Sequence, residues 1–328
     1  MRARVTRANL IQQVRSEQLF DKNDHILVAF SGGYDSLHLL HWLTDGTLPA
    51  DIQPRVSGLY VNHQLRADYQ LAKEEQLVRE TFDQLADKLV TSKVVRLDWQ
   101  EKPQSAVEEQ ARERRYAELA DFAQTIGSNK IATAHHQGDQ IETILYKLIR
   151  GGQAAQLQGM SSCQVLAPGI EIIRPFLDLQ KAQLPDLLKE PITEWIEDDS
   201  NQDINFARNR LRQKVLPELN LINQKAGANI VRLSQQIATL MQLAQPELNR
   251  QVAALKLGDL AWQQDSAVLV LILQSWLNGQ GVFDIKDRQL AQAVKMMQNK
   301  STAHGEVLLS NGRALIKNYQ TLKLQITK

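Results

Sequence analysis

The chain has 328 residues, of which 43% are hydrophobic and 23% are charged. This composition suffices for ordinary buried cores in about two domains, and it excludes a disordered or fibrous protein. Because 38 basic side chains are balanced by 37 acidic ones, the net charge is only +1, so any RNA-binding charge must be local. The single cysteine, Cys163, excludes an internal disulfide and a paired-cysteine metal site, which fits a reducing compartment.

Neither a secretion signal nor a membrane span is expected. The first twenty residues are basic but are interrupted by polar side chains, so they lack the apolar stretch of a signal peptide. The longest apolar run, 267–273, is far shorter than the ~20 residues that cross a bilayer. We therefore expect a cytoplasmic protein with no membrane partner.

The first two thirds of the chain alternate between strand and helix patterns. After an amphipathic helix in 1–20, the apolar run 25–30 predicts a strand that is buried on both faces of a parallel sheet. Further strands are expected at 55–62, 90–99 and 130–134, with helices near 37–46, 68–89, 105–126 and 139–150. This alternation is typical of a doubly wound, mostly parallel α/β sheet, in which ligands bind at the carboxyl ends of the strands.

The pattern changes after about residue 153. Residues 153–180 are rich in loop signals, 204–300 are mainly helical, and Asn311-Gly312 between two apolar runs predicts a β-hairpin. We expect one domain over 1–214, followed by a smaller, mainly helical domain over 215–328 that ends in this hairpin.

A candidate phosphate-binding loop, Ser31-Gly32-Gly33-Tyr34-Asp35-Ser36, lies directly between the first buried strand and the next helix. Adjacent glycines let backbone N–H groups approach a phosphate, and the helix presents its positive end to the anion. Asp35 would repel phosphates unless it holds Mg²⁺, which binds one or two carboxylates together with phosphate oxygens. The alternative is a plain turn in which Asp35 or Ser36 caps the helix. The loop lacks the lysine of a Walker A motif.

The loop matches the SGGxDS signature of the PP-loop, or N-type, ATP pyrophosphatases, and the chain is similar to this family. Five further segments follow in order, at 61–66, 109–116, 132–151, 174–177 and 199–212. Together the six segments resemble the tRNA(Ile)-lysidine synthetases over about residues 20–215. Two departures are visible: Gly138 stands where the family often has an aspartate, and the further carboxyl-terminal domain of longer members is expected to be absent.

The resemblance implies an ATP- and Mg²⁺-dependent ligase, with a PP-loop catalytic domain over 1–214 and a tRNA-binding domain over 215–328. Such an enzyme joins L-lysine to C2 of the wobble cytidine in tRNA(Ile) with a CAU anticodon, through an adenylylated tRNA. It releases AMP and pyrophosphate, and it changes decoding from AUG to AUA. The implied catalytic residues are Asp35, Asp139 and Glu142, with Asp35 also the Mg²⁺ ligand. Asp139 and Glu142 share one helical face, where they can bind the lysine ammonium, accept its proton or complete the Mg²⁺ site.

The remaining candidate residues divide into two sets. The implied ATP-binding residues are Ser31, Gly32, Gly33, Tyr34, Asp35, Ser36, His63, Arg66 and His135. The implied tRNA- or substrate-binding residues are Arg112, Arg115, Arg150, Arg174, Arg208, Asn209, Arg210 and Arg212. For Arg112 and Arg115 the alternative is ordinary ion pairing with neighbouring glutamates 108, 109 or 118. His135 and His136 point to opposite faces of an extended segment and lack a cysteine, which disfavours a transition-metal site.

Two other functions remain as alternatives. Another PP-loop tRNA-modifying enzyme, such as a thiolase, is disfavoured because the chain has a single cysteine. A non-catalytic tRNA- or nucleotide-binding protein is disfavoured because Asp35, Asp139 and Glu142 are all present. Association as a homodimer is left open.

Overall fold

The structure, a computed structural model, describes residues 2–64, 68–99, 107–151, 154–196, 204, 206–282, 285–310 and 312–326. The chain divides into two compact units, Met1–Gln235 and Gln236–Lys328. The functional boundary proposed from the sequence, after residue 214, lies inside the first unit and stays a proposal. In the part of the chain that is described, no helix combines the length and apolarity needed to cross a membrane.

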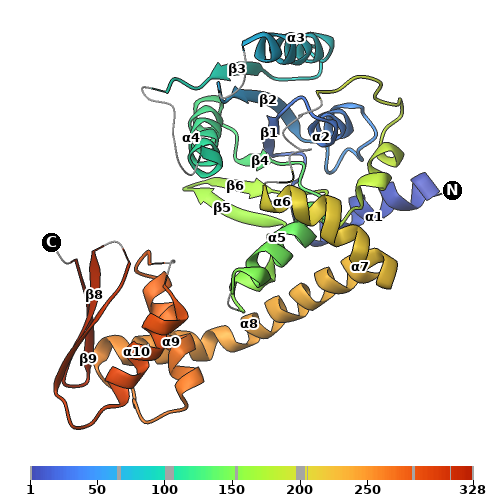
Figure 1. Cartoon of the computed structure of the whole chain (residues 1–328). Coiled ribbons are helices and arrows are strands. Elements are labelled where there is room, and N and C mark those ends of the chain that lie inside the picture. Colours follow the sequence, from blue (N-terminus) through green and yellow to red (C-terminus); the bar gives the residue numbers. More distant parts are fainter. Residues whose placement is uncertain are drawn as a thin grey trace. The chain divides into compact units, whose positions relative to one another are not determined.

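The first unit is built on a six-stranded sheet with the order β3-β2-β1-β4-β6-β5 (Figure 1). Its strands are β1 (His25–Phe30), β2 (Arg55–Asn62), β3 (Ser92–Arg96), β4 (Lys130–Ala132), β5 (Cys163–Ala167) and β6 (Ile170–Ile173). All neighbours pair in parallel except β5, which is antiparallel to β6. The central strand, β1, pairs with both β2 and β4, and its apolar side chains are buried because helices cover both faces of the sheet. The predicted mostly parallel sheet is confirmed.

Helices cover both faces of this sheet. They are α1 (Arg2–Ser16), α2 (Tyr34–Thr44), α3 (Asp68–Gln84), α4 (Val107–Ile126) and α5 (Gln137–Ile149). Successive side chains of β1 alternate between two cores, as a pleated strand requires. Ile26 and Val28 pack with residues of α1, α2 and α3, whereas Leu27 packs with Leu119 of α4. Figure 1 shows α2 and α4 on opposite faces of the sheet.

The segment expected to be loop-rich contains the antiparallel pair of β5 and β6 instead. A turn at Pro168-Gly169 joins the two strands, and Gly169 has φ of 76°, a conformation that glycine adopts without steric cost. Ile170, Ile172 and Ile173 are buried in the sheet, so a short apolar run that pairs with β4 outweighs the local turn signals.

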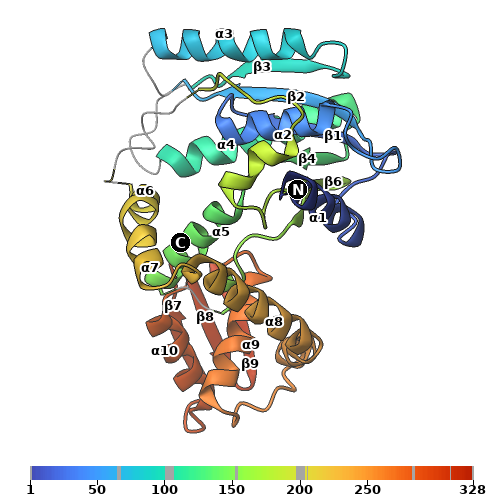
Figure 2. The same ribbon diagram turned by 90° about the vertical axis from the view of Figure 1, so that its right-hand side faces the viewer.

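The remaining described elements of the first unit are helices, and α8 extends past the boundary between the units. The elements are η1 (Gln156–Gln158), η2 (Lys181–Leu187), α6 (Ala207–Arg210), the π-helical η4 (Leu211–Val215), α7 (Leu216–Ile222) and α8 (Ala226–Leu257). Figure 2, turned by 90°, shows α6, α7 and α8 from the side.

The second unit packs the carboxyl-terminal part of α8, two further helices and a small sheet around its own apolar core, which includes Leu255 of α8. Its elements are α9 (Ser266–Asn278), α10 (Asp287–Gln298), β7 (His304–Leu308), β8 (Arg313–Asn318) and β9 (Thr321–Ile326). The predicted hairpin is confirmed as β7 and β8, although Asn311 of its turn lies outside the described residues. A third strand, β9, was not predicted. The turn before β9 has Tyr319 at φ of 53°, a conformation that glycine usually adopts. Because the residue is a tyrosine, the sequence did not indicate a turn at this position.

Candidate active site

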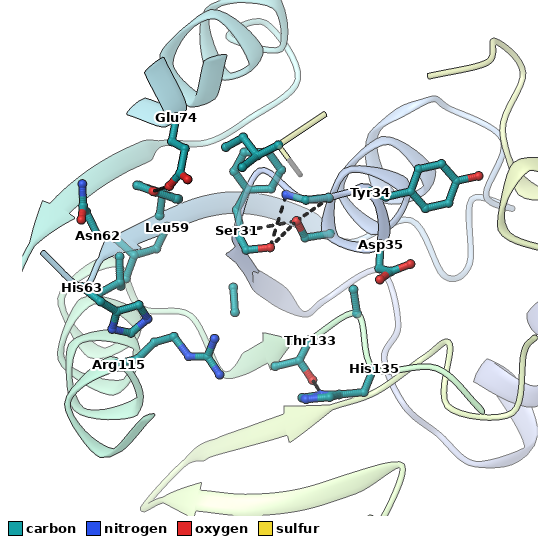
Figure 3. A pocket seen from close by; sticks show the side chains of 18 of the residues that line it. Ser31, Tyr34, Asp35, Leu59, Asn62, His63, Glu74, Arg115, Thr133 and His135 are labelled. Carbon is teal, nitrogen blue, oxygen red and sulfur yellow. Dashed lines mark hydrogen bonds between the residues drawn. The ribbon is translucent and has the colours of Figure 1, made fainter. Parts of the chain in front are cut away.

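A cavity of about 1050 Å³ opens at the carboxyl ends of β1, β2 and β4. Three short segments that follow these strands line it: Ser31 to Ser36, Asn62 to Gln64 and Thr133 to His135. Figure 3 shows Asp35 on one side of this space, with His63 and Arg115 on the other. The sheet therefore brings the candidate loop together with two of the other predicted segments, as the parallel topology predicts.

The candidate phosphate loop is held by its own hydroxyl groups. Ser36 Oγ accepts a hydrogen bond from the Ser31 N–H at 3.2 Å and donates to the Gly33 carbonyl at 3.0 Å. Gly32 has φ of 72°, and a Cβ at this position would collide with Ile196. The N-cap of α2 is Gly33 without a side-chain cap, so neither Asp35 nor Ser36 performs the capping role of the alternative interpretation. The first N–H groups of α2 therefore stay open to a ligand.

Asp35 lies in the first turn of α2 and lines the cavity. Its Oδ2 is 3.0 Å from Nζ of Lys181 and 3.9 Å from Nε2 of His136, whereas its Oδ1 is buried without a hydrogen-bond partner. An unpartnered carboxylate oxygen in a cavity fits a divalent cation. Within the described ranges, no group of three or more His, Cys, Asp or Glu side chains could hold a metal ion. Asp35 would therefore hold Mg²⁺ with water and, once a nucleotide is bound, with phosphate oxygens as the other ligands.

The start of α5 is organised by His136. Its Nδ1 accepts a hydrogen bond from the Gly138 N–H at 3.0 Å, and its own backbone N–H donates to Asp139 Oδ2 at 2.9 Å. This reciprocal arrangement is a capping box, which satisfies two of the free donors at the helix start. A Cβ at Gly138 would lie 2.7 Å from Cε1 of His136, so a side chain at this position and the present ring cannot coexist.

Arg212 closes over the two carboxylates of α5. Its Nε lies 2.6 Å from Oε1 of Glu142, and its Nη2 lies 3.0 Å from Oε2 of Glu142 and 3.3 Å from Oδ1 of Asp139. Burial raises the pKa of the Glu142 carboxyl, and the guanidinium opposes this shift. The hydrogen bond to Glu142 in turn raises the pKa of Arg212. Arg212, predicted as an RNA or substrate ligand, is therefore engaged with the acidic pair.

His135 faces the cavity as a neutral ring. Its Nδ1 pairs with the hydroxyl of Thr133 at 2.8 Å. Burial lowers the pKa of His135 to about 4, and the charges of Arg174, Arg112 and Arg115 act in the same direction. At neutral pH the ring is therefore uncharged, which suits contact with a nucleoside or a polar group of a substrate.

The three arginines near Tyr116 occupy different environments. Arg112 is exposed and stacks on the Tyr116 ring at 4.9 Å. Arg115 lines the cavity, and its Nε is buried without a partner. Arg174 is 3% exposed and donates to the Ser161 carbonyl at 2.6 Å. Among the described side chains, no glutamate or aspartate pairs with Arg112 or Arg115, although the Glu108 side chain lies outside the description.

Two of the other predicted basic residues, Arg150 and Arg208, lie near Tyr146 of α5. Arg150 donates to the Tyr146 hydroxyl at 2.7 Å, and the guanidinium of Arg208 lies 5.8 Å from the centre of its ring. Arg150, Arg208 and Arg210 are exposed, and Asn209 is half-buried. Arg66 lies outside the described residues, and His63, whose carbonyl accepts from Trp99 Nε1 at 2.6 Å, lines the cavity.

Sequence reasoning missed several residues of the cavity wall. Lys181, Trp195, Ile196 and Phe206 all line it. Lys181 lies 146 positions from Asp35 in the chain, and no local sequence pattern predicts such a contact.

Comparison with known proteins places the chain in a family. The family of PP-loop domains matches residues 4–219. The tRNA(Ile)-lysidine synthase of Streptococcus thermophilus is 31% identical over 308 residues, which cover 94% of this chain and 68% of that protein. The chain belongs to the tRNA(Ile)-lysidine synthase family of PP-loop proteins. The family resemblance stated from the six sequence segments is confirmed.

Other relatives differ in how much of their length is matched. The tRNA(Ile)-lysidine synthase of Lactiplantibacillus plantarum is 36% identical over 232 residues, which cover 70% of this chain and 50% of that protein. The chain thus spans half to about two thirds of the length of these lysidine synthases. Among solved structures, the U34-tRNA thiolase NcsA from Methanococcus maripaludis has a TM-score of 0.53 at 14% identity, covering 72% of this chain and 79% of that one. This likeness concerns the fold.

Proposed function

We propose that the chain is an ATP-dependent tRNA(Ile)-lysidine synthase, a ligase that joins L-lysine to C2 of the wobble cytidine of tRNA(Ile) with a CAU anticodon. The observation that carries this proposal is that one cavity contains both the SGGYDS loop with Asp35 and the acidic start of α5 with Asp139. The loop suits the phosphates of a nucleotide, and the acidic start of α5 suits an amine. The names of the relatives support the same substrate.

The first reaction step would activate the cytidine. The cytosine O2 attacks the α-phosphorus of ATP, the bond to the bridging oxygen breaks, and pyrophosphate leaves with that electron pair. The open N–H groups at the start of α2 and the Ser31 hydroxyl would bind the phosphates, and the unpartnered Asp35 oxygen would hold Mg²⁺. When bound, Mg²⁺ supplies positive charge that offsets the charge developing on the leaving group.

The second step would join lysine to the activated base. A lysine amine has a pKa of ~10.4, so it must lose a proton before it attacks C2. Asp139 and Glu142 offer carboxylates that can bind the ammonium and accept this proton, and AMP then departs with the former O2. Because Arg212 pairs with both acids, it would favour the ionised form of the buried Glu142. The ammonium of the lysine substrate must share these carboxylates with Arg212 or displace its guanidinium from them.

The tRNA would approach across the exposed arginines around Tyr146. Arg150 and Arg208 contact this ring, and Arg210 follows in the same short helix. Exposed arginines beside a half-buried aromatic side chain suit an RNA backbone with unstacked bases, as in an anticodon loop. The wobble base would have to leave its stack to reach the cavity.

The alternatives receive less support. A thiolase needs reactive sulfur, whereas Cys163 is half-buried and burial raises the pKa of its thiol. A non-catalytic binder would not need the arrangement of Asp35, Asp139 and Glu142 around nucleotide and amine sites.

One assay separates these possibilities. Purified protein is incubated with ATP, Mg²⁺, labelled lysine and CAU-anticodon tRNA(Ile), with a transcript lacking cytidine at the wobble position as control. Incorporation of lysine into the first RNA only, together with pyrophosphate release, is expected. Absence of incorporation would contradict the proposal. Sulfur-dependent turnover would then favour a thiolase, and tRNA binding without turnover would favour a binding protein.

A further inference from the structure

The loop that should bind phosphates has no lysine of its own, yet a lysine lies in its cavity. Lys181 comes from a segment 146 positions further along the chain. Its Nζ is 3.0 Å from Asp35 Oδ2 and 5.2 Å from the centre of the Tyr34 ring, and both partners belong to the loop. The ammonium group is thus placed beside the groups that would hold a nucleotide.

The backbone that carries Lys181 is anchored firmly. The Gln137 N–H at the start of α5 donates to the Leu179 carbonyl at 2.8 Å, and a capping box joins Gln180 with Gln183. Leu184 and Leu187, on the same short helix as Lys181, are fully buried. The side chain of Lys181, by contrast, is 53% exposed. Because the backbone is fixed and the long side chain is half exposed, the ammonium can move between partners in the cavity.

The charge of Asp35 determines whether the Lys181 ammonium pairs with this carboxylate or with bound phosphates. Its Oδ1 is unpartnered and its Oδ2 is taken by Lys181. A divalent cation that binds Asp35 would be repelled by an ammonium 3.0 Å from the same carboxylate, whereas phosphates would attract that ammonium. Binding of a metal-bound polyphosphate therefore favours an exchange, in which Asp35 turns to the cation and Lys181 turns to the phosphates.

We propose that Lys181 is a polyphosphate-binding residue. It contacts the β- and γ-phosphates of ATP, which leave as pyrophosphate, and it pairs with Asp35 while no nucleotide is bound. This inference rests on the proposed function in so far as ATP is the ligand. A purely structural ion pair at this exposed position would contribute little to stability and would affect no ligand selectively.

The test uses the full chain and three ligands without tRNA or lysine: pyrophosphate, ATP and AMP, each titrated calorimetrically. Lys181→Ala is expected to weaken pyrophosphate and ATP binding by about tenfold, as for loss of one charge-assisted hydrogen bond. AMP binding, which lacks the leaving phosphates, should not change. Lys181→Arg, which keeps the charge, should restore most of the affinity. Lys189→Ala is the matched control, because Lys189 donates to the Asp45 carbonyl at 3.0 Å.

A second measurement, of metal affinity, should change in the opposite direction. Without nucleotide, Mn²⁺ binding measured by electron paramagnetic resonance should be tighter in Lys181→Ala, because the competing ammonium is gone. Unchanged pyrophosphate affinity, an equal loss of AMP affinity, or weaker Mn²⁺ binding in this variant would each overturn the inference. Because these titrations contain neither tRNA nor lysine, selective loss of pyrophosphate binding can be established even if the protein forms no lysidine.

Discussion

The guanidinium of Arg212 and the carboxylate of Glu142 form a two-point ion pair, with contacts of 2.6 and 3.0 Å between residues 70 positions apart. The Glu142 side chain is 4% exposed, and the Arg212 side chain is 43% exposed. The pair therefore joins a buried acid of α5 to a segment at the edge of the cavity. Its energy depends on the protonation of Glu142, since burial alone would favour the neutral acid.

Replacement of Arg212 by alanine should destabilise the protein in a pH-dependent way. Loss of the partner leaves a buried carboxylate, and we expect a cost of about 1–3 kcal/mol, below that of a fully buried pair because Arg212 is partly exposed. The cost should be largest at neutral and higher pH, and it should shrink as the pH falls and Glu142 becomes protonated. Urea unfolding from pH 5 to 8 measures it, with Arg210→Ala as control. A difference that grows at low pH would contradict the assignment.

Gly138 is required by the ring of His136 in this chain. Gly138→Ala should displace the ring, because the added Cβ would lie 2.7 Å from it, and should remove a cap worth about 1 kcal/mol. Gly138→Asp, which introduces the residue that the family often has, should also lower activity here. Lysine incorporation and urea unfolding measure both effects, with Gln137→Ala as control. Higher activity in Gly138→Asp would show that His136 does not need this space.

The parallel strands of the first unit could be predicted because their signals are local, whereas β5, β6 and β9 were missed. Apolar runs mark β1, β2 and β4, and each is followed by a polar segment, so parallel pairing alone brings Ser31, His63 and His135 to one edge of the sheet. The contacts of Lys181 and Arg212 could not be predicted, because they join segments 146 and 70 positions apart through tertiary packing. The cap formed by His136 was also missed, since histidine is not among the usual N-cap residues.

Asp35→Ala should abolish turnover while tRNA binding survives. Loss of the carboxylate would remove the proposed Mg²⁺ ligand, and we expect turnover to fall by at least about a hundredfold. The change also leaves Lys181 without its acidic partner, which adds positive charge and should not weaken RNA binding. Pyrophosphate release and filter binding of tRNA measure the two properties. Loss of tRNA binding with the fold intact would mean that Asp35 has a different role.

The exposed arginines around Tyr146 should act through phosphates. Arg208→Ala or Arg210→Ala is expected to weaken tRNA binding. A plot of the logarithm of the affinity against the logarithm of the salt concentration should also become less steep, by about 0.7–1 for each variant. Arg15→Ala is the control, because Arg15 pairs with Asp51 at 2.8 Å. Titrations at four salt concentrations would show the change in slope. An unchanged slope in both variants would exclude these side chains from the RNA interface.

The neutral state of His135 should make the protein sensitive to acid. Its pKa is lowered to about 4 by burial, against about 6.5 for an exposed histidine, so between these values the unfolded chain binds the extra proton. The stability that this residue contributes is therefore complete above pH 6.5 and is lost as the pH falls toward 4. His135→Asn should flatten the slope of unfolding free energy against pH in this window by at most about 1.4 kcal/mol per pH unit. Urea unfolding at half-unit steps measures the slope, with Gln137→Ala as a non-titrating control. A slope as steep in His135→Asn as in the wild type would mean that another group takes up the proton.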